Sequence, residues 1–465
     1  MGKVLHNVRQ TIFLVLILAA AGMAQDRPSS PPVGALRFYV GACTHFSQGK
    51  GIVEANLDSL KAAGISAIRD EAPWGAVERE KGKLVMPERF DTYVRRAAAK
   101  GLDVMLILDY ANRFYDDGDR PRSPEAIEGF CRYSEFVVRH FGDDVPLYEV
   151  WNEWDIGIGL PERHRKGGSP EDYVKLLKAV YPRIKAANPK STVIAGGSTS
   201  GGVKRGWLEG ILKRGALDDC DAISIHSYNY NDKFPQRGPE ACAAWMADVR
   251  AMLRKYNDGE SVPFYVTEMG WPTHVTKGRT DPELSASYLA RLYLLAREAP
   301  SFRGLWWYDF QDDGWNPEYN EDNFGLVRPD LTPKPGYYVV ADISELVAEG
   351  TFVGRATTDD ETLRVLRFRY DGRDCWALWS ADDEDHQVVL RTEHSGTPVT
   401  IQAAGCDAYE MRWGYRDWVG RGQLVPDRLS VVVGHRPVMI SGDLSGVSVA
   451  EVILRPRRSE KEDER

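Results

Sequence analysis

The sequence predicts an α/β fold, a (β/α)8 TIM barrel followed by a small C-terminal β-sandwich. Two observations lead to this prediction. Between residues 35 and 349, eight short apolar runs alternate with segments whose apolar residues recur at helical spacing. From residue 350 to residue 454 the helical spacing stops, and short alternating strands follow one another. Repeated strand–helix units are typical of a parallel barrel, and helix-free alternation is typical of a sandwich.

The barrel strands are expected where valine, isoleucine and aromatic residues form short continuous runs, because parallel strands are buried on both faces. In chain order, the expected strands are residues 37–44, 65–70, 103–110, 147–152, 192–197, 222–227, 264–267 and 304–308.

The helices between these strands are expected from apolar spacing and from their end signals. Ser123 and Ser169, each followed by proline, are typical N-caps, and Gly64 and Gly101 are typical helix ends. The expected helices are residues 53–63, 89–100, 123–140, 169–187, 207–214, 239–256, 282–298 and 336–347.

The C-terminal region reads as a sandwich of about 110 residues without helices. Because no linker separates it from the last helix, we expect it to pack on the barrel as a structural appendage; an independent sugar-binding module is the alternative. Its expected strands are residues 362–370, 375–380, 387–392, 399–403, 429–433 and 438–441, and residues 455–465 form a charged tail.

The N-terminus predicts export. Lys3 and Arg9 precede a short apolar stretch, and Gly22 and Ala24 provide small residues at a cleavage site. We therefore expect a signal peptide over residues 1–24, a disordered leader over 25–34, and a secreted or periplasmic monomer with no membrane span after cleavage. A net charge of −9 excludes nucleic acid as an expected partner.

The six cysteines leave two alternatives open. Local bridges would join Cys220 to Cys242 and Cys375 to Cys406, while buried free thiols are at least as well supported. No cysteine or histidine spacing suggests zinc, so we expect no metal and no other cofactor.

Two glutamates carry the functional interpretation. Glu153 lies in Leu-Tyr-Glu-Val-Trp-Asn-Glu-Trp-Asp and ends the fourth expected strand, and Glu268 lies in Val-Thr-Glu-Met-Gly-Trp-Pro and ends the seventh. In a (β/α)8 barrel, functional side chains come from the C-terminal strand ends, so both carboxylates should meet at the barrel mouth. Paired carboxylates are what glycosidic bond cleavage requires, whereas either acid alone is as well explained by a salt bridge.

The sequence resembles the retaining glycoside hydrolases of clan A over about residues 35–347. In that clan the fourth-strand glutamate is the acid/base and the seventh-strand glutamate is the nucleophile, which implies these roles for Glu153 and Glu268. The Asn-Glu pair of the clan matches Asn152 and Glu153, although Trp154 stands where proline is common. The segment 69–110 resembles families 39 and 5. Within these, the signal peptide, the small C-terminal β-domain and the glutamate spacing resemble family 39 endoglycosidases of bacterial exopolysaccharides.

The same resemblance implies a set of sugar-binding or site-shaping residues. Arg69 resembles the charge partner of the nucleophile, and one of Trp306 and Trp307 resembles a sugar platform, because strand alternation allows only one of them to face the mouth. His226 and Tyr228 match a His-x-Tyr pattern of the clan near the nucleophile, whereas a structural role explains His45 and Trp271 nearly as well. The expected substrate-binding residues are Asn152, Arg69, His226, Tyr228, Trp306, Trp307, His45, Trp74 and Trp271.

The sequence thus predicts a retaining glycoside hydrolase, endo-acting on a β-linked polysaccharide or exopolysaccharide. An exo-acting β-glycosidase similar to β-xylosidases is one alternative, because loop lengths decide between a groove and a pocket. A carbohydrate-binding barrel without catalysis is the other, although it would not need both glutamates. The sugar and its linkage do not follow from strand-end motifs.

Overall fold

The computed structural model describes residues 37–455, except for residues 234, 277–279, 383, 394–397, 413–414, 418–422 and 426. The expected signal peptide and leader, and nearly all of the charged tail, lie outside the described residues. Among the helices of the described part, none combines the length and apolar character needed to cross a membrane.

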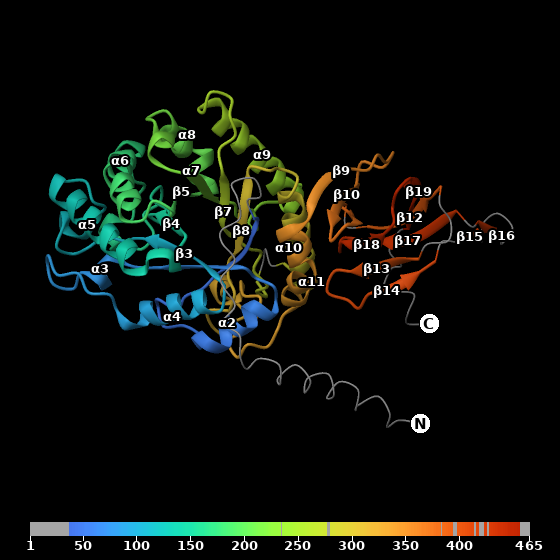
Figure 1. Cartoon of the computed structure of the whole chain (residues 1–465), viewed down its shortest axis with the longest axis horizontal. Helices are drawn as coiled ribbons and strands as arrows, with labels where there is room; N and C mark the ends of the chain where they lie inside the picture. The colour runs from blue at the N-terminus through green and yellow to red at the C-terminus, as the bar shows by residue number, and fades with distance from the viewer. Residues whose placement is uncertain are drawn as a thin grey trace, which may run out of the picture. The chain divides into compact units, whose positions relative to one another are not determined.

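Eight parallel strands close into a barrel in chain order, as the sequence predicts (Figure 1). Each strand pairs with the next, and β8 closes the ring by pairing with β1. The strands are β1 (Tyr39–Cys43), β2 (Ala67–Glu71), β3 (Asp103–Leu108), β4 (Leu147–Val150), β5 (Thr192–Thr199), β6 (Ala222–His226), β7 (Phe264–Met269) and β8 (Phe302–Trp307).

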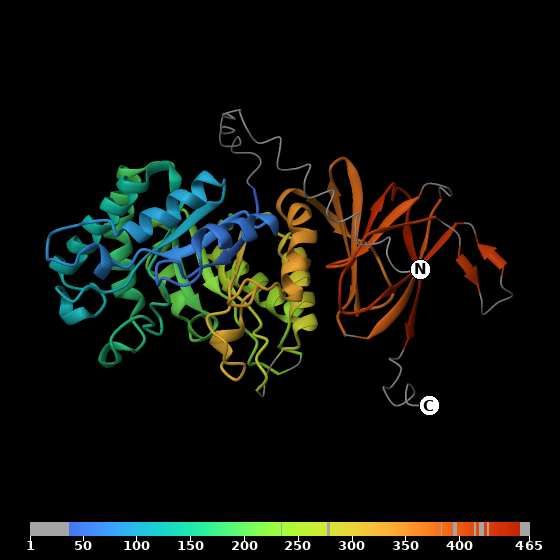
Figure 2. The ribbon, with the colours of Figure 1, turned by 90° about the horizontal axis from the view of Figure 1, so that it is seen from below.

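Helices surround the barrel and bury their apolar faces against it (Figure 2). Ser123 and Ser169 accept hydrogen bonds from backbone amides of the helices that follow them, which confirms both expected N-caps. The helices are α2 (Val53–Ala62), α3 (Trp74–Val77), α4 (Glu88–Ala99), α5 (Pro124–Phe141), α6 (Pro170–Ala187), α7 (Ser200–Lys204), α8 (Trp207–Leu212), α9 (Pro239–Lys255), α10 (Pro282–Ala296) and α11 (Pro335–Glu349).

The inside of the barrel contains two successive layers of side chains. One is an apolar layer of buried residues: Cys43, Ala67, Met105, Leu147, Ile194, Ala222, Tyr265 and Trp306. Two residues further along β2, β4, β6 and β7, where strand alternation returns a side chain to the same face, lies a polar layer of Arg69, Glu149, Ser224 and Thr267. The polar layer leads to the strand ends at which the functional side chains are expected.

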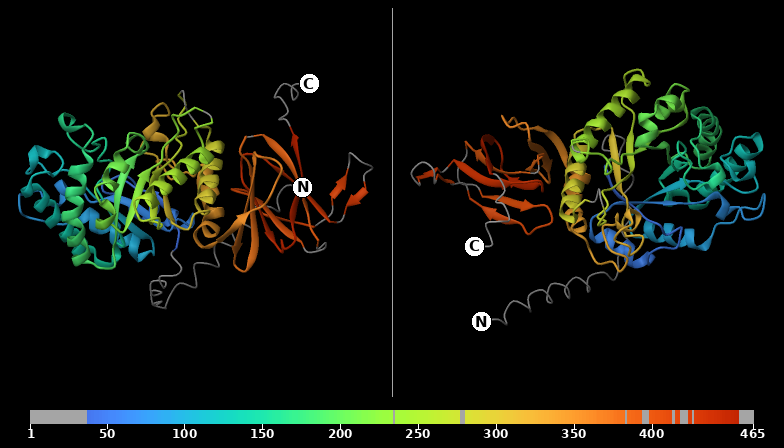
Figure 3. Two further views of the ribbon diagram at one scale, coloured as in Figure 1. Left: turned by 90° about the horizontal axis from the view of Figure 1, so that it is seen from above. Right: turned by 180° about the vertical axis from the view of Figure 1, so that it is seen from behind.

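After α11 the chain forms only strands in the described residues (Figure 3). A six-stranded and a three-stranded antiparallel sheet enclose an apolar core, which confirms the expected sandwich. The strands are β9 (Thr351–Arg355), β10 (Leu363–Tyr370), β11 (Arg373–Ser380), β12 (Asp385–Arg391), β13 (Val399–Ala403), β14 (Tyr409–Met411), β15 (Tyr415–Asp417), β16 (Gln423–Val425), β17 (Arg428–Val433), β18 (Val438–Gly442) and β19 (Ser448–Arg455).

The sandwich and the barrel share buried contacts. Phe368 and Trp379, on the face of β10 and β11 away from the sandwich core, belong to the same apolar cluster as the barrel helices. The Trp379 indole also donates a hydrogen bond to Glu240 of α9 at 2.8 Å. One face of the six-stranded sheet therefore packs on the barrel.

All six cysteines are free thiols, so neither local bridge forms. Cys220 precedes β6, whereas the Cys242 thiol contacts the carbonyl of Ser227 beyond the other end of that strand, which is a strand length too far for a bridge. In the sandwich, Cys375 lies opposite Ser441 in the sheet, while Cys406 lies exposed after β13.

Candidate active site

A cavity of about 730 Å³ opens at the C-terminal ends of the barrel strands. Both glutamates singled out by the sequence line it, together with Arg69, Asn152, Tyr228 and His45. A second cavity of about 460 Å³ adjoins it, because Cys43, Thr44 and His45 line both.

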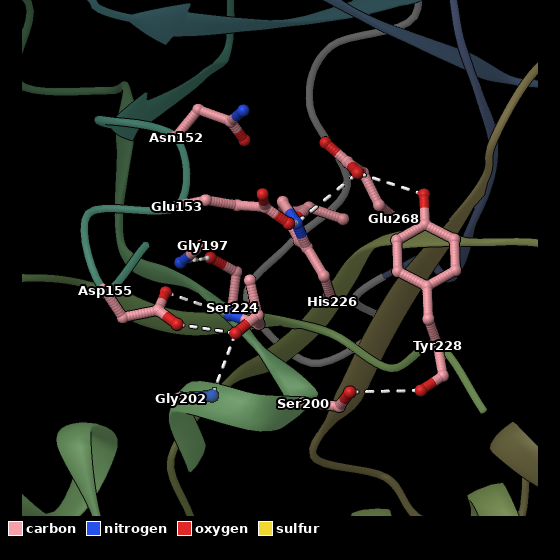
Figure 4. A network of polar contacts seen from close by, with 12 residues as sticks. Asn152, Glu153, Asp155, Gly197, Ser200, Gly202, Ser224, His226, Tyr228 and Glu268 are labelled. Atoms are coloured by element: carbon pink, nitrogen blue, oxygen red, sulfur yellow. Dashed lines mark hydrogen bonds and ion pairs between the residues drawn. The ribbon is translucent and has the colours of Figure 1, made fainter. Parts of the chain in front are cut away.

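Glu153 is positioned by an unusual backbone turn after β4. Trp151 and Glu153 have φ angles of 70° and 48°, a left-handed conformation that non-glycine residues adopt at a cost and that is concentrated at functional sites. The Glu153 amide donates to the carbonyl of Gly197, and Asp155 accepts hydrogen bonds from the amide and hydroxyl of Thr199. These bonds tie the turn to the end of β5 (Figure 4).

Glu268 is the fifth residue of β7 and points into the cavity from the opposite side. Its carboxylate accepts hydrogen bonds from Arg69 Nη1 at 2.7 Å and from the Tyr228 hydroxyl at 3.0 Å. The strand is irregular here, with register shifts against both neighbouring strands. This irregularity lets Thr267 and Glu268, although consecutive, both point to the interior.

His226 brings the two glutamates into one cluster (Figure 4). Its Nδ1 lies 2.7 Å from Glu153 Oε1 and 3.4 Å from Glu268 Oε2. One carboxylate oxygen of each glutamate and a ring nitrogen of His226 all lie within 4.8 Å of one another. The two carboxylates therefore face a common point in the cavity.

The electrostatic surroundings shift the pKa values of the two carboxyl groups in opposite directions. Burial raises the pKa of Glu153, although the hydrogen bond with His226 opposes the shift. For Glu268 burial also favours the neutral form, but the charges of His226 and Arg69 outweigh it and lower the pKa. A carboxyl group with a raised pKa beside one with a lowered pKa is the pattern of an acid paired with a nucleophile or base.

Arg69 is held from behind by Glu149, a residue for which the sequence indicates no role. Glu149 is completely buried; its carboxylate accepts from Arg69 Nε at 2.8 Å and lies 2.7 Å from Arg69 Nη2. It also accepts from the hydroxyls of Ser224 and Thr267. The signal that could have found it is its position in the fourth strand two residues after Leu147, because alternation directs both side chains into the barrel.

Asn152 belongs to a second chain of polar contacts. Its carbonyl oxygen accepts from Arg69 at 2.9 Å, and its amide donates to the Tyr110 hydroxyl at 2.9 Å. The Tyr110 hydroxyl in turn donates to Glu71 at 3.1 Å. Glu71 and Tyr110 line the cavity, so this chain of contacts orients Asn152 and places another carboxyl group in the cavity wall.

His45 lies between the two cavities and contacts acidic residues after β8. Its Nδ1 lies 2.8 Å from Asp313 and 3.7 Å from Asp309. Burial disfavours the charged imidazole, but these carboxylates raise the pKa of His45 to about 9. His45 therefore carries a positive charge at neutral pH.

The predicted tryptophans lie away from the cavity. Trp74 stacks on Tyr115 in the core, and the Trp271 indole donates to Asn229; both are completely buried. Trp306 points into the apolar layer and Trp307 points outward to Trp271, so alternation separates the pair but neither reaches the mouth. Neither Trp306 nor Trp307 lines the cavity, so a sugar platform at either residue stays a prediction. The aromatic residues that line the cavity are Tyr110, Tyr228, Tyr230, Tyr308, Tyr319 and Phe324.

Among the described residues, two clusters have donor atoms close enough to hold a metal ion, namely Glu153 with His226 and Glu268, and His45 with Asp309 and Asp313. In each cluster a side-chain cation already contacts a carboxylate. Arg69 lies 2.7 Å from Glu268, and Lys50 lies 2.6 Å from Asp313. These cations neutralise part of the charge that would attract a metal.

Comparisons with known proteins identify the family of the barrel. The profile of Cellulase (glycosyl hydrolase family 5) matches residues 38–296. No curated protein matches the chain. The structure is similar to a family 39 glycoside hydrolase from the gut symbiont Bacteroides cellulosilyticus WH2, with 28% identity, a TM-score of 0.69, and coverage of 86% of this chain and 80% of that chain.

Two further solved structures share the fold at lower identity. A family 39 β-xylosidase from Caulobacter crescentus has 15% identity and a TM-score of 0.61, covering 90% of this chain and 98% of that chain. A family 30 endoxylanase from Clostridium papyrosolvens C71 has 13% identity and a TM-score of 0.58, covering 88% and 98%. The expected resemblance to clan A is confirmed, and the chain is a glycoside hydrolase that belongs to the cellulase family, glycosyl hydrolase family 5.

Proposed function

We propose that the chain is a retaining glycoside hydrolase in which Glu268 is the nucleophile and Glu153 is the acid/base. The observation that carries this proposal is the approach of the two carboxylates, with one oxygen of each within 4.8 Å. Retaining enzymes hold their carboxyl groups about 5–5.5 Å apart, whereas inverting enzymes leave about 6.5–9.5 Å for a water molecule.

The first half of the reaction follows from the protonation states. A Glu268 oxygen attacks the anomeric carbon while the bond from that carbon to the leaving oxygen breaks, and Glu153 gives its proton to the leaving oxygen. The products are a glycosyl ester on Glu268 and a free sugar hydroxyl. Arg69 and Tyr228 hold the attacking carboxylate in its ionised form and fix its direction.

The second half reverses the roles. Once Glu268 is esterified, its negative charge no longer raises the pKa of Glu153, and Glu153 becomes a base. It takes a proton from water as the water oxygen bonds to the anomeric carbon and the ester bond breaks. The sugar is released with its original configuration, and both carboxyl groups return to their starting states.

We propose endo action on a β-linked polysaccharide, because a second cavity adjoins the catalytic one. The two cavities share the wall residues Cys43, Thr44 and His45, and a binding site that extended over both would accept several sugar units of a chain. A polysaccharide substrate agrees with the secreted or periplasmic location proposed from the N-terminal sequence.

The test combines two variants with a product analysis. Glu268→Gln and Glu153→Gln are expected to reduce turnover of β-linked polysaccharides by at least about 10³-fold, without a change in circular dichroism. Azide is expected to rescue Glu268→Gln less well than Glu268→Gly, because only glycine leaves room for an external nucleophile. Turnover near that of the wild type in either glutamine variant would remove that residue from its role, and release of single sugars alone would favour exo action.

A further inference from the structure

Three side chains that can bind a metal ion meet in the wall of the second cavity, at the seam where β8 pairs with β1. His45 follows β1, and Asp309 and Asp313 follow β8. One donor atom of each side chain lies within 4.8 Å of the other two, and all three residues line the cavity of about 460 Å³. No local pattern in the sequence indicates this cluster, because 268 positions separate His45 from Asp313.

Asp309 has an unusual environment for a carboxyl group. It is 1% exposed, and neither of its carboxyl oxygens has a hydrogen-bond partner. The ring nitrogen Nδ1 of His45 lies 3.7 Å from its Oδ2, which is too long for a hydrogen bond. Burying a carboxyl group without hydrogen bonds is costly, and buried charges in proteins are normally paired or bind metal ions. Because Asp309 lines the cavity, a cation bound there could satisfy both oxygens.

The contacts of Asp313 leave room for a metal ion to compete. Its Oδ1 lies 2.8 Å from His45 Nδ1, and its Oδ2 lies 2.6 Å from Lys50 Nζ. The side chain of Lys50 is 42% exposed and flexible, so it can turn to solvent when another cation binds the carboxylate. An imidazole binds a metal ion through a neutral nitrogen, so a metal ion at Nδ1 would replace the proton that His45 carries there.

The charge of the cavity wall favours a cation. Four aspartates line this cavity, and among its described lining residues Lys50 is the one lysine or arginine. Asp312 is paired with Lys334 at 2.6 Å, and exposed Asp330 accepts a hydrogen bond from a backbone amide. The carboxyl groups of Asp309 and Asp313 are therefore the two that remain to bind a cation together.

We propose that His45, Asp309 and Asp313 form a binding site for one divalent metal ion of the Mn²⁺ or Zn²⁺ class. One imidazole nitrogen with two carboxylates suits these ions better than Ca²⁺, which takes oxygen ligands. Three protein ligands leave coordination positions for water or for a sugar hydroxyl in the cavity. The ion would join the segment after β1 to the segment after β8, and so stabilise the wall that the two cavities share. The site does not depend on the proposed reaction, because neither catalytic glutamate is a ligand.

The test measures metal binding and thermal stability of the purified protein after treatment with EDTA. Mn²⁺ and Zn²⁺ are titrated separately by calorimetry, and free Mn²⁺ is followed by electron paramagnetic resonance. We expect one equivalent of at least one of these ions to bind and to raise Tm by about 3 °C or more at saturation. Absence of binding of both ions up to about 1 mM would overturn the inference.

Asp309→Asn separates the metal site from ordinary packing. Asparagine keeps the shape of the side chain but is a poor metal ligand, so we expect affinity to fall by at least about tenfold and the metal-dependent rise in Tm to disappear. Without metal, Tm should equal or exceed that of the wild type, because the variant lacks a buried carboxyl group without hydrogen bonds. Asp313→Asn, at a more exposed position, should lose affinity to a similar extent and provides a second variant.

Two control variants locate the bound ion. Asp330→Asn removes a carboxyl group from the same cavity but outside the cluster, and Glu268→Gln removes one from the other cluster of possible ligands. Both should keep the wild-type affinity for the metal ion. An equal loss of affinity in Asp330→Asn would attribute binding to the overall charge of the cavity. Loss in Glu268→Gln with unchanged binding in Asp309→Asn would place the ion at the catalytic glutamates, and either result would overturn the inference.

Discussion

The apolar layer and the polar layer inside the barrel lie two residues apart along the same strands, but they have different roles. The apolar layer is filled by residues such as Met105, Tyr265 and Trp306, which pack without charges. The polar layer buries Arg69 and Glu149 as an ion pair with every carboxylate oxygen hydrogen-bonded. The comparison indicates that the barrel gains stability from one layer and sets the charge state of its site with the next.

The largest effect is expected from Arg69→Met, which removes the cation of the polar layer. Glu149 and Glu268 would be left as buried carboxylates without their partner, so we expect the free energy of unfolding to fall by about 3–5 kcal/mol. Loss of the cation also raises the pKa of Glu268, so the acid limb of the pH profile of kcat/KM should move to higher pH. Urea unfolding and a pH series measure the two effects, and an unmoved acid limb would separate Arg69 from the nucleophile.

Trp306→Ala tests the apolar layer and is expected to cost about 3–5 kcal/mol of unfolding free energy, because it opens a cavity beside Tyr39 and Tyr265. Turnover per folded molecule should remain within a few-fold of the wild type. A large fall in kcat at unchanged stability would instead make Trp306 the sugar platform that the sequence suggests. Comparison with Tyr308→Ala, which alters the cavity wall, provides the matched control.

Glu149→Gln tests the polar layer by removing the charge of its buried carboxylate. The glutamine keeps the shape of the side chain but loses the charge, so we expect about 1.5–3 kcal/mol of destabilisation from the weakened bonds to Arg69. Removing a negative charge near Glu268 favours its ionised form, so the acid limb should move to lower pH, opposite to Arg69→Met. A shift of the acid limb in the same direction for both variants would show that geometry and not charge controls the pKa of the nucleophile.

The smallest effect is expected from Tyr228→Phe, which deletes one hydrogen bond to Glu268 at 3.0 Å. We expect the ionised carboxylate of Glu268 to lose about 1 kcal/mol of stabilisation. The acid limb of the pH profile should then shift slightly to higher pH, and kcat/KM should fall several-fold. Tyr230→Phe is a suitable control, since Tyr230 lines the cavity but its hydroxyl bonds to Asn320. An equal loss in both variants would assign the effect to general wall polarity.

Much of the fold could be predicted from the sequence because its signals are local. All eight barrel strands occur within a few residues of their expected ranges, and Ser123 and Ser169 cap the expected helices. In the sandwich, the short strands β9, β14, β15, β16 and β19 were not predicted, because alternation over so few residues, or at a chain end, is a weak signal.

Only part of the site was predicted from the sequence: Glu149 was given no role, and Trp306 was expected in the cavity wall. The physical reason is that strand register decides which side chains face the interior. Sequence places a residue at a strand end, but a register shift in β7 decides that both Thr267 and Glu268 face inward. The same dependence on register places Tyr308 in the cavity wall and leaves Trp306 in the apolar layer.

By itself the sequence determined the barrel, the sandwich and the two glutamates, because periodic burial and strand-end position are properties of short segments. The tertiary structure decided which side chains meet: that His226 contacts both glutamates, that Glu149 holds Arg69, and that the cysteines remain unpaired. These contacts join residues far apart in the chain, and their distances depend on barrel closure and strand register, which no local pattern of residues records.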